Sequence, residues 1–376
     1  MKARSVMKRT LYSVTTLALL AVAAHAAPFT AGDLAVLQVG DGSGALTSGS
    51  TALFIDEFSP SGTFVQMISV PTADGTQFTE SGTASSEGAL TLSSDGSVLA
   101  FAGYAASPGV ATIASTPAAT YSRAVGVISA SGTYSRVATG SSAFDGNNVR
   151  SAVSDGHNFW LAGTASATGN SGIWYSGGGG VPVQVGSGNY RNANIASGNL
   201  YVSTSAGTTP GVSGFSGLPT GAATSSLLLA VTGGTPSPYD FALSPDGTFA
   251  YVADDRSGKT FGGIERWNLS AGVWTMAYNL APGTTANDGM RQFTVDFSGA
   301  HPVIFGTTVE ASANRLVEVT DTGAGSAFTL LATAGANTVY RGVDFTPTQV
   351  PEPSALVLLG LRSLLLVSRR SLAKRP

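Results

Sequence analysis

Cysteine is absent from this chain of 376 residues, histidine occurs three times, and charged residues make up 11% of the sequence, against about 25% in ordinary globular domains. The lack of cysteine excludes disulfide bonds, haem attachment through thioether bonds, cysteine-based zinc sites and a cysteine nucleophile. A chain without such cross-links depends on the burial of an apolar core, and its length is sufficient to form one.

Basic residues are also scarce in the body of the chain. Between Ala27 and Pro353 there are ten Lys and Arg but 22 Asp and Glu, which gives a formal charge of −12. Binding to nucleic acid or to an anionic membrane surface requires a basic footprint. We therefore expect neither as a partner, and the negative charge favours solubility outside the cell.

The first 26 residues have the three parts of a secretory signal peptide. Four basic residues precede an apolar stretch over residues 11–24, and Ala24-His25-Ala26 is a small-residue cleavage site. The apolar stretch is short for a membrane span, so a retained N-terminal anchor is the weaker alternative. We expect signal peptidase to cut before Ala27.

The last 27 residues begin with two helix breakers and continue as an apolar run. Pro351 and Pro353 lack backbone donors, so no helix or central strand runs through them. Residues 354–367 are long enough for a helix of about 14 residues, whereas a bilayer crossing takes about 20. Arg362 interrupts this run with a charge that costs at least about 2.5 kcal/mol in a membrane.

The order of these features resembles the PEP-CTERM sorting signal. The matching residues are the motif Val350, Pro351, Glu352 and Pro353 and the arginines Arg369 and Arg370 after the apolar run. The resemblance implies processing by an exosortase, a membrane protease of bacteria that make extracellular polysaccharide. It also implies transient anchoring in the inner membrane and a final location outside the cell or on its surface. The usual signal has an uninterrupted apolar core that ends in arginines, and Arg362 departs from it.

The body between the two ends, residues 27–349, has the pattern of an all-β protein. Short β-branched or aromatic runs alternate with Gly, Asp and Pro turns, and no stretch shows sustained helical periodicity. One unit recurs, in which a strand, a turn with glycine and a second apolar strand follow one another. Its turn glycines are Gly96, Gly156, Gly198, Gly247 and Gly299, with spacings of 60, 42, 49 and 52 residues. These spacings match four-stranded propeller blades of about 40–50 residues.

The two ends of the body complement each other. A sixth copy of the first strand, residues 340–347, has no outer strands after it, whereas residues 33–40, 50–60 and 62–70 supply three strands with none before them. Pairing them closes a ring and removes an exposed edge. We predict a six-bladed β-propeller, with seven blades as the main alternative if residues 103–146 hold another. A β-sandwich pair and a β-helix are further alternatives. The repeats resemble those of secreted propeller proteins that carry this tail, but they lack the WD40 signature.

Four inner strands begin with an apolar or aromatic residue followed by arginine. The arginines are Arg150, Arg191, Arg291 and Arg341, and a fifth strand holds Asp240 at the corresponding place. Equivalent positions in a propeller meet around one mouth of the central channel. Such a ring would bind carboxylates of an acidic polysaccharide, since arginine forms bidentate pairs with them. Alternatively, each arginine ties its blade to the next through carbonyls or a carboxylate such as Asp240, Asp296 or Asp344. We favour this structural interpretation.

No catalytic, metal or cofactor site is predicted. The pair Asp254-Asp255 is interpreted as a solvated turn rather than a calcium site, and His157 and His301 lack a second ligand nearby in the sequence. The four tryptophans are expected to fill blade interfaces, with a sugar-stacking platform as the alternative. Neither histidine lies in a nucleophile motif.

Two functions are compatible with these features of the sequence. The favoured one is a non-enzymatic protein of the cell surface or extracellular matrix, whose propeller binds exopolysaccharide. The alternative is a secreted propeller hydrolase or lyase that acts on an acidic glycan with carboxylic acids at the channel mouth.

Overall fold

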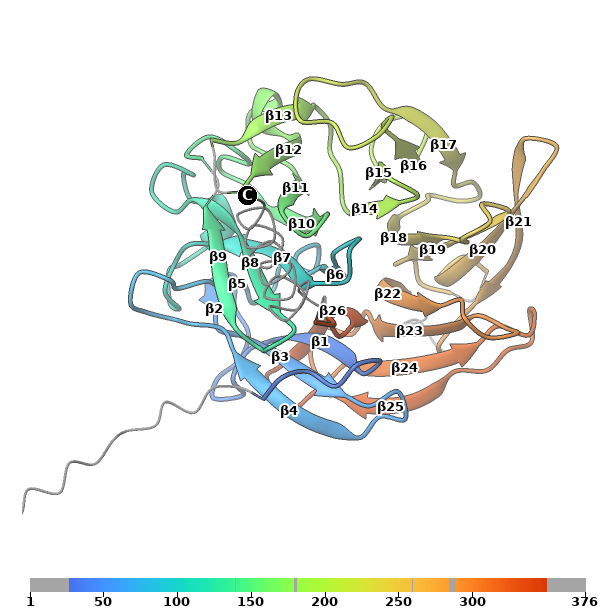
Figure 1. Cartoon of the computed structure of the whole chain (residues 1–376), viewed down its shortest axis with the longest axis horizontal. Helices are drawn as coiled ribbons and strands as arrows, with labels where there is room; N and C mark the ends of the chain where they lie inside the picture. The colour runs from blue at the N-terminus through green and yellow to red at the C-terminus, as the bar shows by residue number, and fades with distance from the viewer. Residues whose placement is uncertain (1–26, 139, 179–180, 259, 284–288, 350–376) are drawn as a thin grey trace, which may run out of the picture.

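The computed structural model describes residues 27–349 except residues 139, 179–180, 259 and 284–288. The predicted signal peptide and the predicted sorting tail, with their cleavage and motif residues up to Ala26 and from Val350, lie outside the described residues. Six four-stranded antiparallel sheets stand around a central axis as the blades of a β-propeller (Figure 1). The six-bladed prediction is therefore confirmed.

The blades are numbered in ring order, and their strands are given from the axis outwards. Blade 1 contains β26 (Val339–Phe345), β1 (Leu34–Val39), β3 (Leu53–Phe58) and β4 (Phe64–Ser69). Blade 2 contains β6 (Leu90–Leu92), β7 (Val98–Tyr104), β8 (Arg123–Ser129) and β9 (Tyr134–Ala138). Blade 3 contains β10 (Val149–Ser154), β11 (Asn158–Gly163), β12 (Gly172–Gly177) and β13 (Val183–Gly186).

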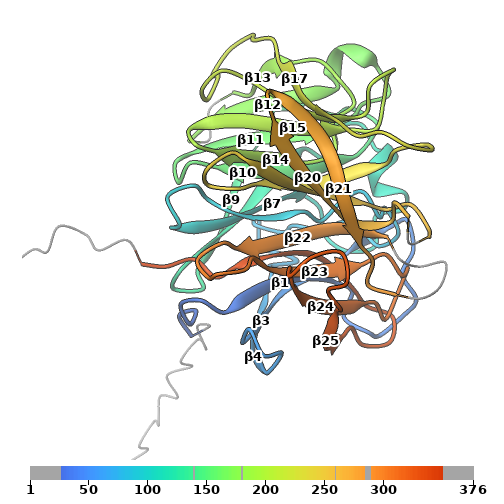
Figure 2. The ribbon, with the colours of Figure 1, turned by 90° about the vertical axis from the view of Figure 1, so that its right-hand side faces the viewer.

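The other three blades have the same order. Blade 4 contains β14 (Ala193–Ala196), β15 (Asn199–Thr204), β16 (Gly211–Gly214) and β17 (Ser226–Ala230). Blade 5 contains β18 (Pro238–Leu243), β19 (Phe249–Asp254), β20 (Gly263–Ser270) and β21 (Val273–Leu280). Blade 6 contains β22 (Met290–Asp296), β23 (Val303–Thr308), β24 (Arg315–Thr320) and β25 (Thr329–Thr333), which follow one another from axis to rim in Figure 2. The short elements are β2 (Ser50–Thr51), β5 (Glu80–Ser81) and the 3-10 turns η1 (Ile113–Ser115) and η2 (Thr168–Asn170).

The ring closes through the two ends of the body. Strand β26 pairs antiparallel with β1, with Val343 opposite Val36. The C-terminal strand thus supplies the inner strand of blade 1, and the N-terminal segment supplies the three outer ones, as predicted. The segment 103–146, which the seven-blade alternative required to hold a blade, supplies β8, β9 and η1 instead.

The turns after the inner strands explain why the repeat was visible in the sequence. Gly96 and Gly247 have φ values of 74° and 69°, a left-handed conformation that glycine adopts without steric cost. The preceding Asp95 and Asp246 each accept a backbone N–H two residues further on, at 3.0 Å. This local hydrogen bond fixes a tight turn between the two innermost strands of a blade.

The core lies between the blades, where the faces of neighbouring sheets pack together. Phe241 and Trp267 of blade 5 are buried against Val212 and Leu229 of blade 4. Burial of a large apolar side chain contributes about 1.5–3 kcal/mol, and this contribution recurs at every junction. Trp267 is 2% exposed, and Trp160 and Trp174 are 1% and 8% exposed, so these three tryptophans fill interfaces as expected.

A closed belt of hydrogen bonds through inner-strand side chains joins the six inner strands around the channel. Each bond crosses from one blade to the next, so that every one of the six junctions has one. The bonds, in ring order, are Leu92 N to Asp344 Oδ2 (2.6 Å), Thr91 Oγ1 to Ala152 O (2.7 Å), Ala193 N to Ser151 Oγ (3.1 Å), Asn194 Nδ2 to Asp240 Oδ1 (3.0 Å), Phe293 N to Asp240 Oδ2 (3.3 Å) and Thr294 Oγ1 to Asp344 Oδ1 (2.8 Å).

Candidate functional site: an arginine-lined mouth of the channel

The four predicted arginines lie at the end of the channel where the inner strands begin. Arg191 and Arg291 both contact the ring of Tyr239, with their guanidinium carbons 3.9 Å and 5.4 Å from its centre. Burial and, to a smaller extent, the positive charge of Arg191 lower the pKa of Arg150. Burial also lowers the pKa of Arg341, and the nearby charge of Arg291 adds to this effect. We call Arg150, Arg191, Arg291 and Arg341 the arginine mouth.

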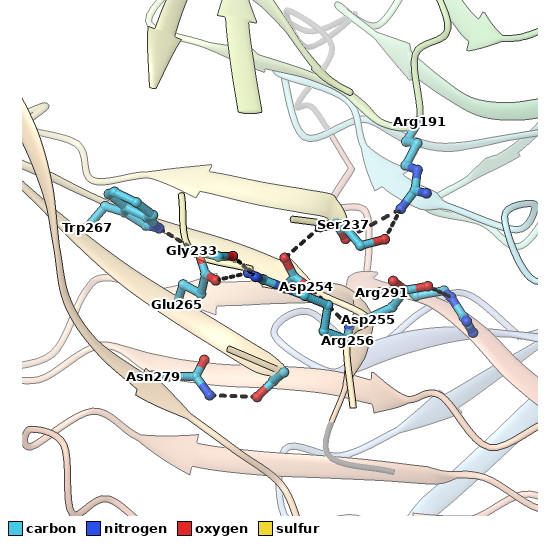
Figure 3. Close-up of polar contacts among 11 residues, drawn as sticks. Arg191, Gly233, Ser237, Asp254, Asp255, Arg256, Glu265, Trp267, Asn279 and Arg291 are labelled. Carbon is cyan, nitrogen blue, oxygen red and sulfur yellow. Dashed lines mark hydrogen bonds and ion pairs between the residues drawn. The ribbon is translucent and has the colours of Figure 1, made fainter. Parts of the chain in front are cut away.

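Two of these arginines tie their blade to the next one. Arg150 of blade 3 donates from Nη1 to Asn189 Oδ1 at 2.6 Å and to Tyr190 O at 3.0 Å, both in the segment that leads into blade 4. Arg191, just before β14, donates from Nη1 to Ser237 Oγ at 2.9 Å, at the edge of blade 5 (Figure 3). These bonds agree with the structural interpretation of the ring.

The other two arginines pair with carboxylates that the sequence did not indicate. Arg291 Nε lies 3.0 Å from Asp255 Oδ2 of blade 5 (Figure 3). Arg341 Nη1 lies 3.5 Å from Glu80 Oε2, and its Nη2 donates to the carbonyls of Ser81 and Gly82, each at 2.9 Å. The carboxylates are therefore not Asp240, Asp296 or Asp344, the examples that the sequence offered, whereas the predicted bonds to carbonyls are present for Arg150 and Arg341. Two of those three belong to the belt inside the channel instead.

Two arginines of the mouth keep donors that no other described residue accepts. Nη1 and Nη2 of Arg291 form no hydrogen bond with another described residue, and the side chain is 23% exposed. Nε and Nη2 of Arg191 are likewise without a partner among the described residues. A guanidinium whose two terminal nitrogens are free offers the paired donors that bind a carboxylate in bidentate fashion. With respect to the described residues, Arg291 thus combines a structural bond with an open binding edge.

A cavity of about 240 Å³ lies beside Arg291 and Arg341. We call it the mouth pocket. Its walls come from the inner strands of blades 1 and 6, from the segment that links blade 1 to blade 2, and from the loop after β23. The residues that line it are Gly82, Thr83, Ser85, Glu87, Arg291, Gln292, Thr307–Ala311 and Val339–Arg341.

An amide pair joins blades 4 and 6 beside the mouth pocket. Asn192, just before β14, and Gln292 of β22 exchange two hydrogen bonds of 3.1 Å each, although blade 5 lies between their blades in the ring. Their side chains are buried, and the pair links blade 4 directly to blade 6. Farther along the channel lies a second cavity of about 180 Å³, which we call the lower chamber.

Two buried acids, Glu80 and Glu87, lie next to Arg341. Burial raises the pKa of Glu80 to about 8, with Arg341 opposing the shift, so this carboxyl holds its proton at neutral pH. Glu87 accepts hydrogen bonds from Ser81 N at 2.8 Å and Tyr104 Oη at 2.6 Å. Burial also raises the pKa of Glu87, but these donors and Arg341 favour its charged form.

Sequence reasoning missed this acid pair because its partners come from distant segments. Arg341 lies 261 positions after Glu80. The only signal in the sequence is the occurrence of two acids in the Gly, Ser and Thr-rich link between blades 1 and 2. Such acids are ordinarily solvated, and nothing local indicates their burial.

Asp240 does not belong to the arginine mouth. Its carboxylate is part of the belt, accepts a hydrogen bond from Asn194 and lines the lower chamber beside Asp344. Burial raises the pKa of Asp240 to about 7, with hydrogen bonds opposing the shift. The position therefore serves the channel wall rather than the ring of arginines.

The pair Asp254-Asp255 is not a solvated turn, which corrects the prediction. Asp254 is fully buried and accepts from Arg256 Nε at 2.8 Å, while Arg256 Nη2 lies 2.7 Å from Glu265 Oε1. Trp267 Nε1 donates to Glu265 at 2.9 Å (Figure 3). Asp255 in turn holds Arg291. These contacts within blade 5 surround Asp255, which holds Arg291.

The described residues contain neither a cluster of metal ligands nor a membrane-spanning helix. Within the part of the chain that the structure describes, no group of three or more His, Cys, Asp and Glu side chains is placed to hold a metal ion. In the same residues, no helix has the length and hydropathy needed to span a bilayer.

Comparison with known proteins gives structural likeness only. No family model matches the sequence, and no curated protein matches it either. Solved structures of similar shape include a periplasmic gluconolactonase of Pseudomonas aeruginosa, 14% identical over 78% of this chain and 82% of that chain, with a TM-score of 0.45. Another is a chain of a nidogen–laminin complex, 11% identical over 85% and 99%, with a TM-score of 0.47. A third, from Bacteroides uniformis, carries a provisional 6-phosphogluconolactonase assignment and is 13% identical over 85% and 84%, with a TM-score of 0.46. At these values the comparisons assign no activity to this chain.

Proposed function

We propose that this is an exported protein of the cell surface or extracellular matrix whose propeller binds an acidic polysaccharide at the arginine mouth. The observation that carries the proposal is the state of Arg291. Its Nε is fixed by Asp255 at 3.0 Å, and its two terminal nitrogens face no described partner at the rim of the mouth pocket. A fixed guanidinium with a free bidentate edge is pre-organised for a carboxylate, because little conformational entropy is lost on binding.

The charges around the pocket support an anionic ligand. The mouth collects four of the ten basic residues of a body that is otherwise strongly acidic. Glu80, with its pKa raised to about 8 by burial, adds no full negative charge at neutral pH. The four arginines outnumber the neighbouring acids Asp255 and Glu87, so the arginine mouth is a local positive region that attracts anions more strongly than the net charge of the molecule indicates.

The test is a binding assay of the purified protein on acidic and neutral polysaccharides. We expect retention on uronate-rich polymers and none on neutral ones, and we expect Arg291→Met to lower the affinity at least tenfold. Arg136→Met is the matched control, since Arg136 lies on the outer strand β9 and donates to Gln77 O and Gly75 O. Equal losses in the two variants, or no binding to any uronate polymer, would contradict the proposal.

The second candidate function is a hydrolase or lyase that acts on such a glycan. The observation that favours it is Glu87, a buried acid with a raised pKa that lines the same pocket as Arg291 and Arg341. A carboxyl of this kind serves as a general acid or base when a sugar lies against it. Release of oligosaccharide fragments by the protein, abolished in Glu87→Gln, would establish this function. Retention of the polymer without products supports binding alone.

The proposed export has its own test. Cleavage before Ala27 and processing of the tail near Pro353 would give a mature chain that lacks both ends. Intact-mass measurement of the protein recovered from the medium or the cell surface should show both cuts, and disruption of the exosortase should leave the C-terminal segment attached. Recovery of the complete chain from the cytosol would refute the assignment.

A further inference from the structure

We propose that the arginine mouth binds two neighbouring acidic units of a polysaccharide at once. Arg291 binds the carboxylate of one unit, and a second subsite, formed by Arg150, Arg191 and Tyr239, binds the carboxylate of the next. This inference rests on the proposed binding function and names the class of its ligand, a polymer in which uronates follow one another directly.

Tyr239 holds two arginines of the mouth near each other. It lies in β18, the inner strand of blade 5, and this blade stands between those of Arg191 and Arg291 in the ring. The guanidinium carbons of these arginines lie 3.9 Å and 5.4 Å from the centre of its ring, within the reach of about 6 Å that a cation–π interaction has. Two like charges from blades 4 and 6 are thus held against one aromatic ring.

The charges of Arg150 and Arg191 are not neutralised by a described carboxylate. Neither arginine forms an ion pair with a described residue, and both are half-buried. Hydrogen bonds from Arg150 go to an amide oxygen and a backbone carbonyl, and those from Arg191 go to the hydroxyl and the carbonyl of Ser237. Burial lowers the pKa of Arg150, and the charge of Arg191 lowers it further, while the charge of Glu87 opposes this effect more weakly. An anion beside the two arginines would stabilise both charges.

The same side chains keep hydrogen-bond donors that no described residue accepts. In Arg191 these are Nε and Nη2, which form one edge of the guanidinium and suit a carboxylate held in bidentate fashion. In Arg150 they are Nη2 and Nε, and this Nε is fully buried. The hydroxyl of Tyr239 has no partner among the described residues either, although the residue is only 5% exposed. Because donors in such places are costly to leave unpaired, a ligand that accepts from them is favoured.

Two subsites that lie close together select a ligand by the distance between its charges. The donor edges of Arg191 and Arg291 belong to different side chains, so that each takes its own carboxylate. Because both arginines contact the same ring, the two carboxylates must also lie close together. Directly linked uronates carry carboxylates on adjacent units, whereas a neutral unit between them moves the charges apart. Engagement of both subsites raises the affinity only where the spacing of the ligand fits.

The experiment compares ligands that carry the same number of charges at two spacings. The full protein is titrated calorimetrically with monomers of galacturonate and mannuronate, with their directly linked dimers, and with the tetrasaccharide of hyaluronate. In that tetrasaccharide a neutral amino sugar separates two glucuronates. We expect the dimer of at least one uronate to bind at least about tenfold more tightly than its monomer, and at least about fivefold more tightly than the tetrasaccharide.

Two variants test the second subsite. Arg191→Met removes its cation, and Tyr239→Phe removes one hydroxyl while it keeps the ring that the arginines contact. We expect the affinity advantage of the dimer over the monomer to fall to about twofold in Arg191→Met and by at least about threefold in Tyr239→Phe. Arg136→Met, on the outer strand β9, should leave this advantage unchanged. Thermal midpoints show whether the variants fold, and if Arg191→Met does not, Tyr239→Phe decides alone.

The outcomes separate the inference from the function on which it rests. Equal affinities for the dimers and the tetrasaccharide, or binding of hyaluronate alone, would overturn the inference and leave the proposed function standing. The same holds if the dimer keeps its full advantage in either folded variant. If no uronate ligand of any length binds, both fail. An advantage of the dimer that depends on both side chains supports both.

Discussion

Substitution of Arg341 by methionine tests whether the arginine mouth holds the ring together from inside. Arg341 is 7% exposed, and its guanidinium joins β26 of blade 1 to the segment that leads into blade 2. Methionine has a similar volume and no charge. The variant therefore removes the cation and its hydrogen bonds while it leaves much of the packing in place.

The expected cost can be worked out from the contacts. Two hydrogen bonds of 2.9 Å to the carbonyls of Ser81 and Gly82 are lost, and hydrogen bonds to charged groups contribute about 1.5–3 kcal/mol each. Glu87, whose charged form Arg341 favours against the effect of burial, also loses that nearby positive charge. Because these effects overlap, we expect the free energy of unfolding to fall by about 3–5 kcal/mol.

The contribution of Glu80 distinguishes this account from a simple salt bridge. Its pKa of about 8 keeps it protonated at neutral pH, and its oxygen lies 3.5 Å from Arg341. Glu80→Gln should therefore cost less than about 1 kcal/mol, and a double-mutant cycle with Arg341→Met should give a small coupling energy. Urea unfolding at pH 7 measures all four proteins. A loss below about 1 kcal/mol in Arg341→Met would refute the reasoning.

Three further predictions concern the belt and the channel. First, burial raises the pKa of Asp240 from 3.8 to about 7, so between these pH values the native state binds a proton that the unfolded chain has released. The stability gained from this proton is fully present below pH 3.8 and is lost as the pH rises through 7. It amounts to roughly 4 kcal/mol at most, and the urea midpoint should fall from pH 5 to pH 8 by less in Asp240→Asn than in the wild type. Second, Thr294→Val removes the 2.8 Å bond to Asp344 and should lower the free energy of unfolding by about 1.5–3 kcal/mol. A thermal midpoint equal to that of the wild type would show that this bond of the belt does not stabilise the protein. Third, Asn192→Leu and Gln292→Leu should each cost about 1–3 kcal/mol, because each leaves a buried amide unpaired. The double variant should cost less than the sum of the two, and strict additivity would contradict the pairing of blades 4 and 6 through these amides.

The arrangement of the blades could be predicted because its signals are local. A turn such as Pro245-Asp246-Gly247 needs a glycine with positive φ and an aspartate that bonds two residues on, and both requirements are visible within a few residues. The closure was predictable for a related reason. The chain has one inner strand too many at its end and three outer strands too many at its start, and only pairing removes both edges.

The candidate site could be predicted only in part. Equivalent positions of a repeat occupy equivalent places in the ring, so the four arginines were expected at one mouth before any contact was known. Their partners were not, because the contacts between blades join residues that are far apart in the sequence. Asp255 lies 36 positions from Arg291, and the carboxylates proposed from the sequence belong to the belt or to a turn. The same separation hid Glu80 and Glu87.

By itself, the sequence determined the architecture. The turns and the alternating apolar residues are encoded within each segment, and six copies of this unit form a closed ring. Only the tertiary structure decided which polar groups meet inside the channel and at its mouth. Asn192 and Gln292 are ordinary amides 100 positions apart until folding sets them 3.1 Å from each other and joins blade 4 to blade 6. The physical reason is that backbone turns are fixed by neighbours along the chain, whereas burial, pKa and hydrogen-bond partners are fixed by neighbours in space.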